Sequence, residues 1–258
     1  VRVAVEDSPA RINLSYKFGC APGAVPALLA QAAALGVAVK GLSFHVGSQI
    51  TDPACHVQAI ERCAALIADN HATGDGHLTV LDIGGGFPAA YDADVPAIET
   101  FCAPLREALA RLPGYVRVIA EPGRFIAAEA VRSIATVVGK AERAGRPWYY
   151  LDDGVYGSFS GHIFDGARYP LRAMRRAGAG DADAASLRPA TLAGPTCDSV
   201  DIVSEDSLLP ELAIGDFVVA DRMGAYTAAT ANDFNLVGRA RIVVVNGPGA
   251  SGARHQVA

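Results

Sequence analysis

The sequence predicts an α/β protein in which part of a (β/α)8 barrel is followed by a mainly β domain, built as a β-sandwich or a β-barrel-like sheet. Two observations predict this fold. Apolar strand patterns alternate with helical patterns over the first half of the chain. After about Phe125, short β-rich segments separated by Gly, Pro and Asp replace them. The expected domains are residues 1–129 and 130–258.

Strands and helices alternate along the first domain. Residues 1–5 place valine at every second position and have no initiator Met before them, so we expect a strand there that belongs to a longer polypeptide. Further buried strands are expected at Val37–Val46, Leu78–Ile83 and Val116–Ala120. Helices are expected at Val25–Leu35, Cys55–Asp69 and Ile98–Leu112. This alternation indicates a parallel sheet, either doubly wound or part of a barrel, and three or four such units are too few to close a barrel.

The second domain is expected to be mainly β. The clearest strand candidates are Val131–Val138, Trp148–Asp152, Phe217–Ala220 and Arg239–Val245. The stretch Arg175–Arg188 is rich in Ala, Gly and Asp and is expected to form a surface loop. The tail, residues 246–258, has no packing pattern.

Charge and cysteine content restrict the class of partner. The chain has 22 Lys and Arg against 27 Asp and Glu, a net charge of −5, and its basic residues are scattered. A nucleic-acid partner is therefore not expected. Five cysteines without C-x-x-C spacing argue against a metal site and a disulfide framework, and they favour the reducing cytoplasm. No apolar run is long enough to span a membrane, so a membrane partner is not expected either. The charge balance instead favours a small-molecule partner.

Three successive glycines follow the expected strand Leu78–Ile83. Gly84, Gly85 and Gly86 would let backbone N–H groups approach an anion closely, which favours phosphate binding. The alternative is an ordinary tight turn at a strand end. The triplet is not G-x-G-x-x-G, and Pro88 interrupts a helix start, so a dinucleotide-binding fold is disfavoured.

Polar side chains also follow two other expected strands. Glu121 and Arg124 lie in E-P-G-R after one strand, and His45 and Ser48 lie in F-H-V-G-S-Q at the end of another. In barrel enzymes the catalytic and binding residues lie at the C-terminal ends of the strands. A local ion pair on a turn and a hydrogen-bonded core histidine are the simpler interpretations.

Candidate residues in the later sequence lie in turns. Cys197 and Asp198 are adjacent in one turn, Asp165 lies in another, and Tyr226 follows a glycine. Each acid alone is compatible with an Asx turn, and Tyr226 with a packed tyrosine or a phosphate donor.

Six motifs in order resemble one enzyme family. They are FHVGSQ, LDIGGGFP, EPGR, DDGVYGSF, GPTCDSVD and MGAYT. Together they are similar to the ornithine/diaminopimelate/arginine decarboxylases, and most of all to the eukaryotic-type ornithine decarboxylases. The resemblance extends over residues 1 to about 245. It implies a pyridoxal 5′-phosphate cofactor, a (β/α)8 barrel with a C-terminal β domain, and a homodimer with shared active sites.

The resemblance assigns a role to each matching residue. His45 would stack on the cofactor ring, and Glu121 would face the pyridine nitrogen. A carboxylate there keeps the nitrogen protonated, so that the ring accepts electrons when CO₂ departs. In the family, Cys197 reaches the partner's active site and helps protonate the substrate carbon. The phosphate would be held by Ser48, Gly84, Gly85, Gly86, Gly123, Arg124 and Tyr226.

Substrate choice follows from the charges at the far end of the site. Asp165 and Asp198 match the family positions that bind the distal amine of ornithine, and Phe234 matches an aromatic residue that lines the pocket. Two carboxylates favour a cationic end over a carboxylate. The expected reaction is decarboxylation of L-ornithine to putrescine, a step of polyamine biosynthesis. Lysine differs by one methylene, which a pocket distinguishes by only about 1–3 kcal/mol, so a lysine/ornithine or other diamino-acid decarboxylase is the alternative.

One family residue has no counterpart in the sequence. The lysine that bonds the cofactor covalently lies upstream of the FHVGSQ motif in the family, and neither Lys17 nor Lys40 nor Lys140 matches it. We therefore expect the chain to be the second part of a longer polypeptide, or to be completed by another chain. A non-catalytic homologue similar to the antizyme inhibitors is the other alternative.

Overall fold

The computed structural model describes residues 1–5, 9–10, 12, 14–74, 78–91, 94–176 and 186–245. The chain divides into two compact units. The first comprises Val1–Ile134, Ile163–Arg172 and Val219–Tyr226, and the second comprises Ala135–His162, Ala173–Val218 and Thr227–Ala258. These units are defined by contacts and not by continuous sequence. The single boundary expected between residues 129 and 130 stays a prediction.

The first unit contains a four-stranded parallel sheet. Its strands are β1 (Arg2–Val3), β2 (Gly41–Phe44), β3 (Val80–Asp82) and β4 (Arg117–Ile119). They lie in the order β1-β2-β3-β4, and each pairs in parallel with the next. Doubly wound sheets reverse their strand order, whereas a (β/α)8 barrel keeps chain order. The prediction of a partial barrel is therefore confirmed, and the doubly wound alternative is wrong.

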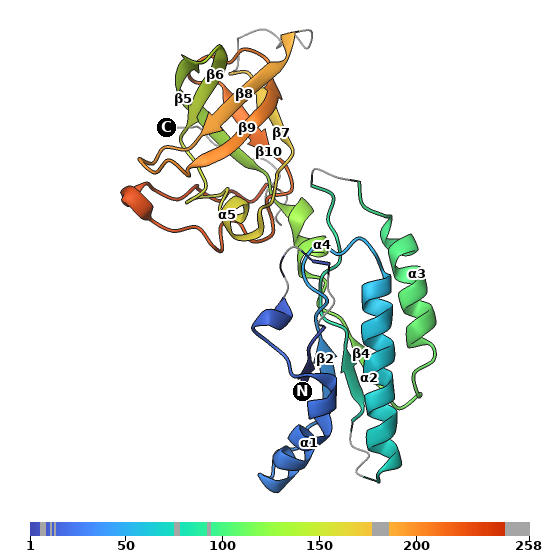
Figure 1. The fold of residues 1–258 in the computed structure, drawn as a ribbon. Coiled ribbons are helices and arrows are strands. Elements are labelled where there is room, and N and C mark those ends of the chain that lie inside the picture. The colour runs from blue at the N-terminus through green and yellow to red at the C-terminus, as the bar shows by residue number, and fades with distance from the viewer. Residues whose placement is uncertain are drawn as a thin grey trace. The chain divides into compact units, whose positions relative to one another are not determined.

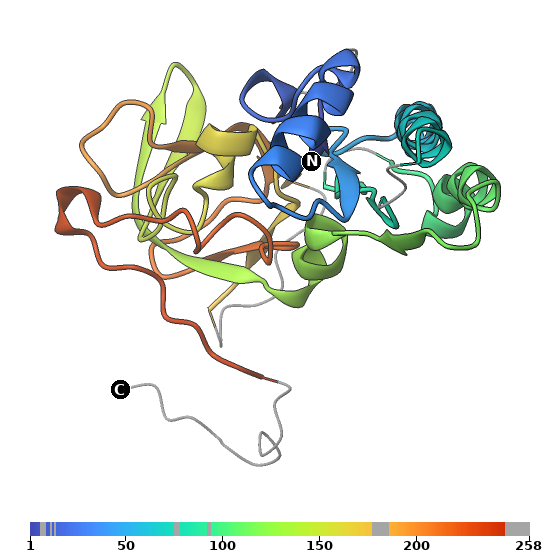
Figure 2. The ribbon, with the colours of Figure 1, turned by 90° about the horizontal axis from the view of Figure 1, so that it is seen from below.

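A helix follows each strand of this sheet. These helices are α1 (Val25–Ala34), α2 (Ala54–Ala72), α3 (Ile98–Leu109) and α4 (Gly123–Ala127), and short 3-10 turns lie at Leu14–Tyr16, Pro22–Ala24 and Ala128–Ala130. Helices α2 and α3 lie side by side in both views (Figures 1 and 2). Among the described residues, no helix combines the length and the apolar character needed to cross a membrane.

Helix α2 packs one face into the core of the first unit. Its buried residues recur every three or four positions, which places them on one side of the helix. They are His56, Ala59, Ile60, Cys63 and Ile67. The four apolar ones, Ala59, Ile60, Cys63 and Ile67, belong to the cluster that also contains Leu42, Phe44 and Leu81 of the sheet and Phe101 of α3. Burying each large apolar side chain contributes about 1.5–3 kcal/mol.

The remaining strands form a six-stranded mixed sheet. They are β5 (Ser133–Arg143), β6 (Arg146–Leu151), β7 (Leu171–Met174), β8 (Arg188–Ala193), β9 (Ile202–Leu209) and β10 (Phe217–Ala220). Their order is β7-β10-β5-β6-β8-β9. Strands β5 and β6 pair antiparallel, β6 and β8 parallel, and β8 and β9 antiparallel. A short helix, α5 (Gly161–Asp165), and a 3-10 turn at Phe234–Leu236 complete the elements. The prediction of a β-rich second part is confirmed.

One expectation for this part is wrong, and two others fall partly or wholly on residues that the structure does not describe. The strand expected at Arg239–Val245 is wrong, because these residues join no sheet and residues 242–245 keep exposed apolar side chains. An apolar run becomes a strand only where a neighbouring strand takes up its backbone hydrogen bonds. Of the loop expected at Arg175–Arg188, residues 177–185 lie outside the described residues, and Arg188 begins β8. The tail, residues 246–258, also lies outside them.

Candidate active site

The glycine turn, Gly84–Gly86, packs directly against the end of strand β2. A Cβ atom on Gly84 would lie 2.2 Å from the carbonyl oxygen of Phe44, and one on Gly86 would lie 2.3 Å from that of Gly47. Both residues also have positive φ, 63° and 94°. Any larger residue would therefore both clash and be strained, so glycine is required at these two positions.

Every carbonyl of the glycine turn accepts a hydrogen bond. The N–H of Glu121 donates to the Gly84 oxygen at 2.8 Å, and the N–H of Ile50 donates to the Gly86 oxygen at 2.9 Å. The Gly85 oxygen lies 3.1 Å from Nε2 of His56. In contrast, the N–H groups of Gly85 and Gly86 donate to no acceptor in the described part of the chain. Two amide donors therefore remain for an anion.

His45 lies against the glycine turn in neutral form. A Cβ atom on Gly85 would lie 3.1 Å from Nε2 of His45. The N–H of Gly47 donates to Nδ1 of His45 at 3.0 Å, so Nε2 carries the proton. Burial lowers the pKa of His45, Arg2 lowers it further, and Asp82 opposes the shift. The result is an uncharged ring at the end of β2, and Ser48 follows it, half-buried.

The E-P-G-R segment after β4 connects the glycine turn with Tyr226. A Cβ atom on Gly85 would lie 2.7 Å from the carbonyl oxygen of Glu121, whose side chain is exposed. Two residues later, a Cβ atom on Gly123 would lie 3.8 Å from Oη of Tyr226. Tyr226 itself has a positive φ of 54°, which is uncommon for a non-glycine residue. The structure thus brings together residues from three strand ends and from the later sequence.

Arg124 is buried and held by three side chains. Its Nη2 donates to Oδ2 of Asp165 at 2.5 Å and its Nη1 donates to Oη of Tyr91 at 3.2 Å. The guanidinium also lies 4.6 Å from the centroid of the Tyr226 ring. Burial lowers the pKa of Arg124, but the hydrogen bonds to Asp165 and Tyr91 outweigh it and raise the pKa overall. Nε is buried without a partner among the described residues.

Three of the remaining candidates lie in the second unit. Oη of Tyr156 donates a short hydrogen bond to Oδ2 of Asp198, and its ring stacks on Phe234 with centroids 4.4 Å apart. This hydrogen bond raises the pKa of Tyr156 and lowers that of Asp198. Cys197 is exposed, and Asn235 accepts hydrogen bonds from its backbone N–H at 3.2 Å and from its Sγ at 3.4 Å.

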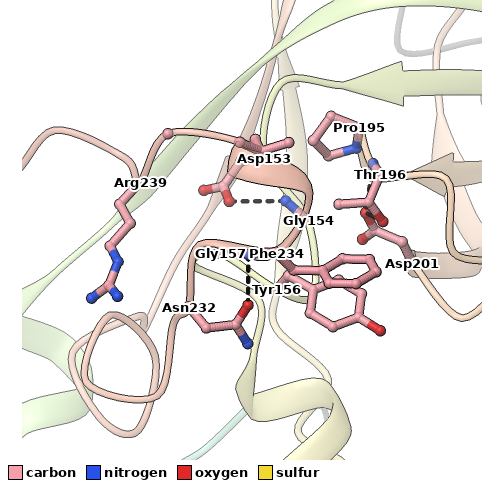
Figure 3. A pocket seen from close by; sticks show the side chains of 12 residues that line it. Asp153, Gly154, Tyr156, Gly157, Pro195, Thr196, Asp201, Asn232, Phe234 and Arg239 are labelled. Carbon is pink, nitrogen blue, oxygen red and sulfur yellow. Dashed lines mark hydrogen bonds between the residues drawn. The ribbon is translucent and has the colours of Figure 1, made fainter.

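A small pocket adjoins this second group (Figure 3). The stacked rings of Tyr156 and Phe234 form one wall, and Asp201 lies beside them. Asp201 accepts hydrogen bonds from Val155 and from Thr196, which fixes the turn that carries Cys197 and Asp198. Oδ1 of Asp153 accepts from the N–H of Gly154, as Figure 3 shows.

The predicted site residues therefore fall into two groups. In the first unit, His45, Glu121, Arg124, Asp165 and Tyr226 lie around the glycine turn or in contact with one another. In the second unit, Cys197, Asp198 and Phe234 share neighbours. Within the described ranges, no group of three or more His, Cys, Asp or Glu side chains is placed to hold a metal ion.

Sequence reasoning missed several residues that hold these groups. Tyr91, Tyr156, His56 and Asn235 each contact a predicted site residue. The DDGVYGSF motif contains Tyr156, so its position was a usable signal. His56 gives no such signal, because it occupies an apolar helix face on which a buried, hydrogen-bonded histidine is ordinary.

The first unit fits a phosphorylated ring cofactor. Several donors here suit a phosphate: two amides and the Nε–H of a buried guanidinium, which have no partner among the described residues, and a tyrosine hydroxyl. An uncharged imidazole and a carboxylate at the same strand ends suit an aromatic nitrogen ring. The residues present therefore fit pyridoxal phosphate.

Comparisons with known proteins agree with this geometry. Residues 1–128 match the pyridoxal-binding domain of the pyridoxal-dependent decarboxylases. A lysine/ornithine decarboxylase of Selenomonas ruminantium is 38% identical over 239 residues, which cover 91% of this chain and 58% of the relative. An ornithine decarboxylase of Panagrellus redivivus is 40% identical over 255 residues, which cover 91% of this chain and 57% of the relative.

A solved structure shows the same fold. The lysine/ornithine decarboxylase of Vibrio vulnificus, in complex with cadaverine, superposes with a TM-score of 0.86 at 48% identity. The match covers 96% of this chain and 64% of that protein. This chain thus spans about three fifths of the length of these relatives. It belongs to the family of pyridoxal-phosphate-dependent ornithine, lysine and arginine decarboxylases.

Proposed function

We propose that this chain is part of an enzyme that decarboxylates L-ornithine to putrescine and CO₂. One observation carries the proposal: two amides of the glycine turn, without a partner in the described ranges, lie beside His45 and Glu121, in the unit that also holds buried Arg124. Within one unit, the amides and Arg124 supply hydrogen-bond donors for a phosphate. His45 supplies a flat neutral ring, and Glu121 supplies a carboxylate. Pyridoxal phosphate, when bound, supplies a ring that accepts the electron pair left as CO₂ departs.

The residues around the glycine turn bind and tune the cofactor in this proposal. The amides of Gly85 and Gly86, with Arg124 and Tyr226, hold the phosphate, and Ser48 adds a hydroxyl. His45 stacks on the ring, and its lowered pKa keeps it uncharged at neutral pH. The Glu121 carboxylate holds a proton at the pyridine nitrogen, because a neighbouring negative charge favours the protonated form of that nitrogen.

Substrate recognition is assigned to two carboxylates and one aromatic residue. Asp165 and Asp198 bind the distal ammonium, and Phe234 contacts the methylene chain. The stacking of Phe234 on Tyr156 supports this role, because it fixes an apolar ring next to the Asp198 carboxylate. The Cys197 thiol delivers a proton to the substrate carbon after CO₂ has left.

A lysine/ornithine decarboxylase is the second candidate. The names of the Selenomonas ruminantium and Vibrio vulnificus relatives give both substrates. One additional methylene changes binding by only about 1–3 kcal/mol, so a pocket that accepts ornithine readily accepts lysine as well.

We also propose a homodimer with shared active sites as the working form, in a reducing compartment such as the cytoplasm. All five cysteines are free thiols, which supports the choice of compartment. The Cys197 thiol is exposed and is hydrogen-bonded to Asn235. Because it is accessible at the surface, it supports an active site that is completed by a second copy of the chain.

The test is release of labelled CO₂ from L-ornithine and L-lysine by the intact protein with pyridoxal phosphate. We expect release from ornithine, and a loss of at least about 100-fold in kcat for Glu121→Gln and for Cys197→Ala, consistent with the loss of a general acid–base group. The matched control is Glu107→Gln, at an exposed position of α3, which keeps full activity. Binding of the cofactor without CO₂ release from either substrate would overturn the proposal and favour a non-catalytic homologue.

A further inference from the structure

His56 is a fully buried polar residue directly behind the glycine turn. It lies on α2, it is 0% exposed, and three aromatic rings surround it. The centroids of Phe44, Phe87 and Phe101 lie 6.5, 5.1 and 5.5 Å from that of the imidazole. An apolar side chain of similar size would fill this cage without the cost of burying polar atoms. The hydrogen bond of His56 is therefore its distinguishing contribution.

That hydrogen bond goes to the glycine turn. Nε2 of His56 lies 3.1 Å from the carbonyl oxygen of Gly85. A carbonyl oxygen only accepts hydrogen bonds, so Nε2 carries the proton and Nδ1 does not when the ring is neutral. Nδ1 is buried and has no partner in the described part of the chain. The single N–H donor of the neutral imidazole is therefore hydrogen-bonded to the Gly85 carbonyl.

The direction of this carbonyl sets the direction of the next amide. The peptide bond between Gly85 and Gly86 is trans, so its C=O and N–H point in opposite directions. With the oxygen held toward α2, the N–H of Gly86 points away from the helix. Because glycine rotates more freely than any other residue, this peptide has little intrinsic preference for that orientation.

We propose that His56 is a positioning residue that fixes the Gly85–Gly86 peptide, so that the Gly86 N–H is aimed at the phosphate of the bound cofactor. The inference rests on the proposed function in one respect, because the anion is taken to be that of pyridoxal phosphate. His56 does not touch the phosphate. It acts through the Gly85–Gly86 peptide, because its hydrogen bond disfavours the flipped orientation of that peptide plane.

A purely structural role predicts a different result. If His56 only fills the cage, replacing it changes stability and weakens the binding of every ligand of the site alike. If it aims an amide at the phosphate, replacing it weakens the binding of ligands that carry the phosphate. Pyridoxal, which lacks the phosphate, separates the two roles.

The experiment measures Kd for pyridoxal phosphate and for pyridoxal by titration of the intact protein, and uses their ratio. His56→Phe fills the cage without a donor, and we expect it to reduce the preference for pyridoxal phosphate by about tenfold, the value of one hydrogen bond to a charged group. His56→Gln places an amide N–H near the position of Nε2 and should restore the ratio to within about twofold of the original. Phe101→Leu, a control in the same cage, should leave the ratio unchanged.

Each other outcome overturns a distinct claim. An unchanged ratio of the two Kd values in His56→Phe, whether both affinities fall equally or neither falls, would overturn the role of His56. Should His56→Phe fail to fold, His56→Asn replaces it, because its shorter amide keeps polarity but does not reach the Gly85 oxygen. Its ratio should fall as well, and an unchanged ratio would overturn the role equally. A wild-type protein that does not prefer pyridoxal phosphate over pyridoxal would instead overturn the proposed function.

Discussion

Arg124 and Asp165 form a buried ion pair, with Nη2 and Oδ2 2.5 Å apart and side-chain exposures of 7% and 17%. In the proposed function Arg124 binds the phosphate of the cofactor, and Asp165 binds the distal ammonium of the substrate. The two roles are compatible because a guanidinium has five N–H donors. Nη1 and Nη2 are engaged by Tyr91 and Asp165, while the Nε–H stays available to an anion.

Loss of the Asp165 carboxylate should destabilise the fold. Asp165→Ala leaves the Arg124 guanidinium buried with no counter-charge, which costs about 3 kcal/mol in unfolding free energy. The control is Asp206→Ala, which removes the exposed partner of Arg146 and should cost at most about 1 kcal/mol. Urea unfolding of both variants checks the difference, and equal losses would contradict the importance of burial at Asp165.

A methyl group at Gly85 should disrupt the cofactor site. In Gly85→Ala the Cβ atom would lie 2.7 Å from the Glu121 oxygen and 3.1 Å from Nε2 of His45, so the backbone or the imidazole must shift. We expect the affinity for pyridoxal phosphate to fall at least about tenfold, because the amides lose their alignment. Gly114→Ala is the control, since nothing lies within 4 Å of its Cβ. Fluorescence titration that gives equal affinities for the two variants would contradict the proposed phosphate site.

The sequence predicts the strand ends well and the contacts between them poorly. The glycine turn, Glu121 and His45 were accessible because each follows an apolar run, and consecutive parallel strands place their ends at one edge. The pairing of Arg124 with Asp165 was not accessible, because it joins residues 41 positions apart through tertiary packing. The wrong strand at Arg239–Val245 has the same origin, since local pattern does not reveal whether a neighbouring strand is available.

Removing the Tyr156 hydroxyl should raise the pKa of Asp198. In the native protein the hydrogen bond from Oη stabilises the charged carboxylate and lowers its pKa. A group with a depressed pKa contributes stability above its unfolded-state pKa, and this contribution is lost as the pH falls through the folded-state value. In Tyr156→Phe the Asp198 pKa should therefore move upward toward the ordinary range, and the contribution should shrink.

Carbon-detected NMR titration of the Asp198 carboxyl checks this shift. Tyr150→Phe is the matched control, because the Tyr150 hydroxyl accepts its hydrogen bond from Arg143. An unchanged Asp198 pKa in Tyr156→Phe would show that the hydrogen bond does not persist in solution.

Mild acid should destabilise the protein through His56. Burial lowers the pKa of His56 to about 4, against about 6.5 in an unfolded chain. Between these two pH values the unfolded state binds more protons at His56 than the folded state does. The free energy of unfolding therefore rises with pH over this window, and acidification removes this stabilisation. The difference corresponds to about 3 kcal/mol. Denaturant unfolding from pH 7 to pH 4 should show a shallower dependence in His56→Phe than in the native protein, and parallel curves would refute the assignment to His56.

Thiol reactivity should differ sharply between Cys197 and Cys63. Cys197 is exposed on its turn, whereas Cys63 is 1% exposed in the core face of α2, where burial raises its pKa to about 12. Since the thiolate is the reactive form, Cys63 should resist alkylation at pH 8 until the protein unfolds, while Cys197 should react in the native state. Burial also raises the pKa of Cys55 and Cys102, so both should react more slowly than Cys197. Mass-spectrometric mapping of a timed iodoacetamide reaction gives this order directly, and native labelling of Cys63 at the rate of Cys197 would mean that α2 does not pack as the structure shows.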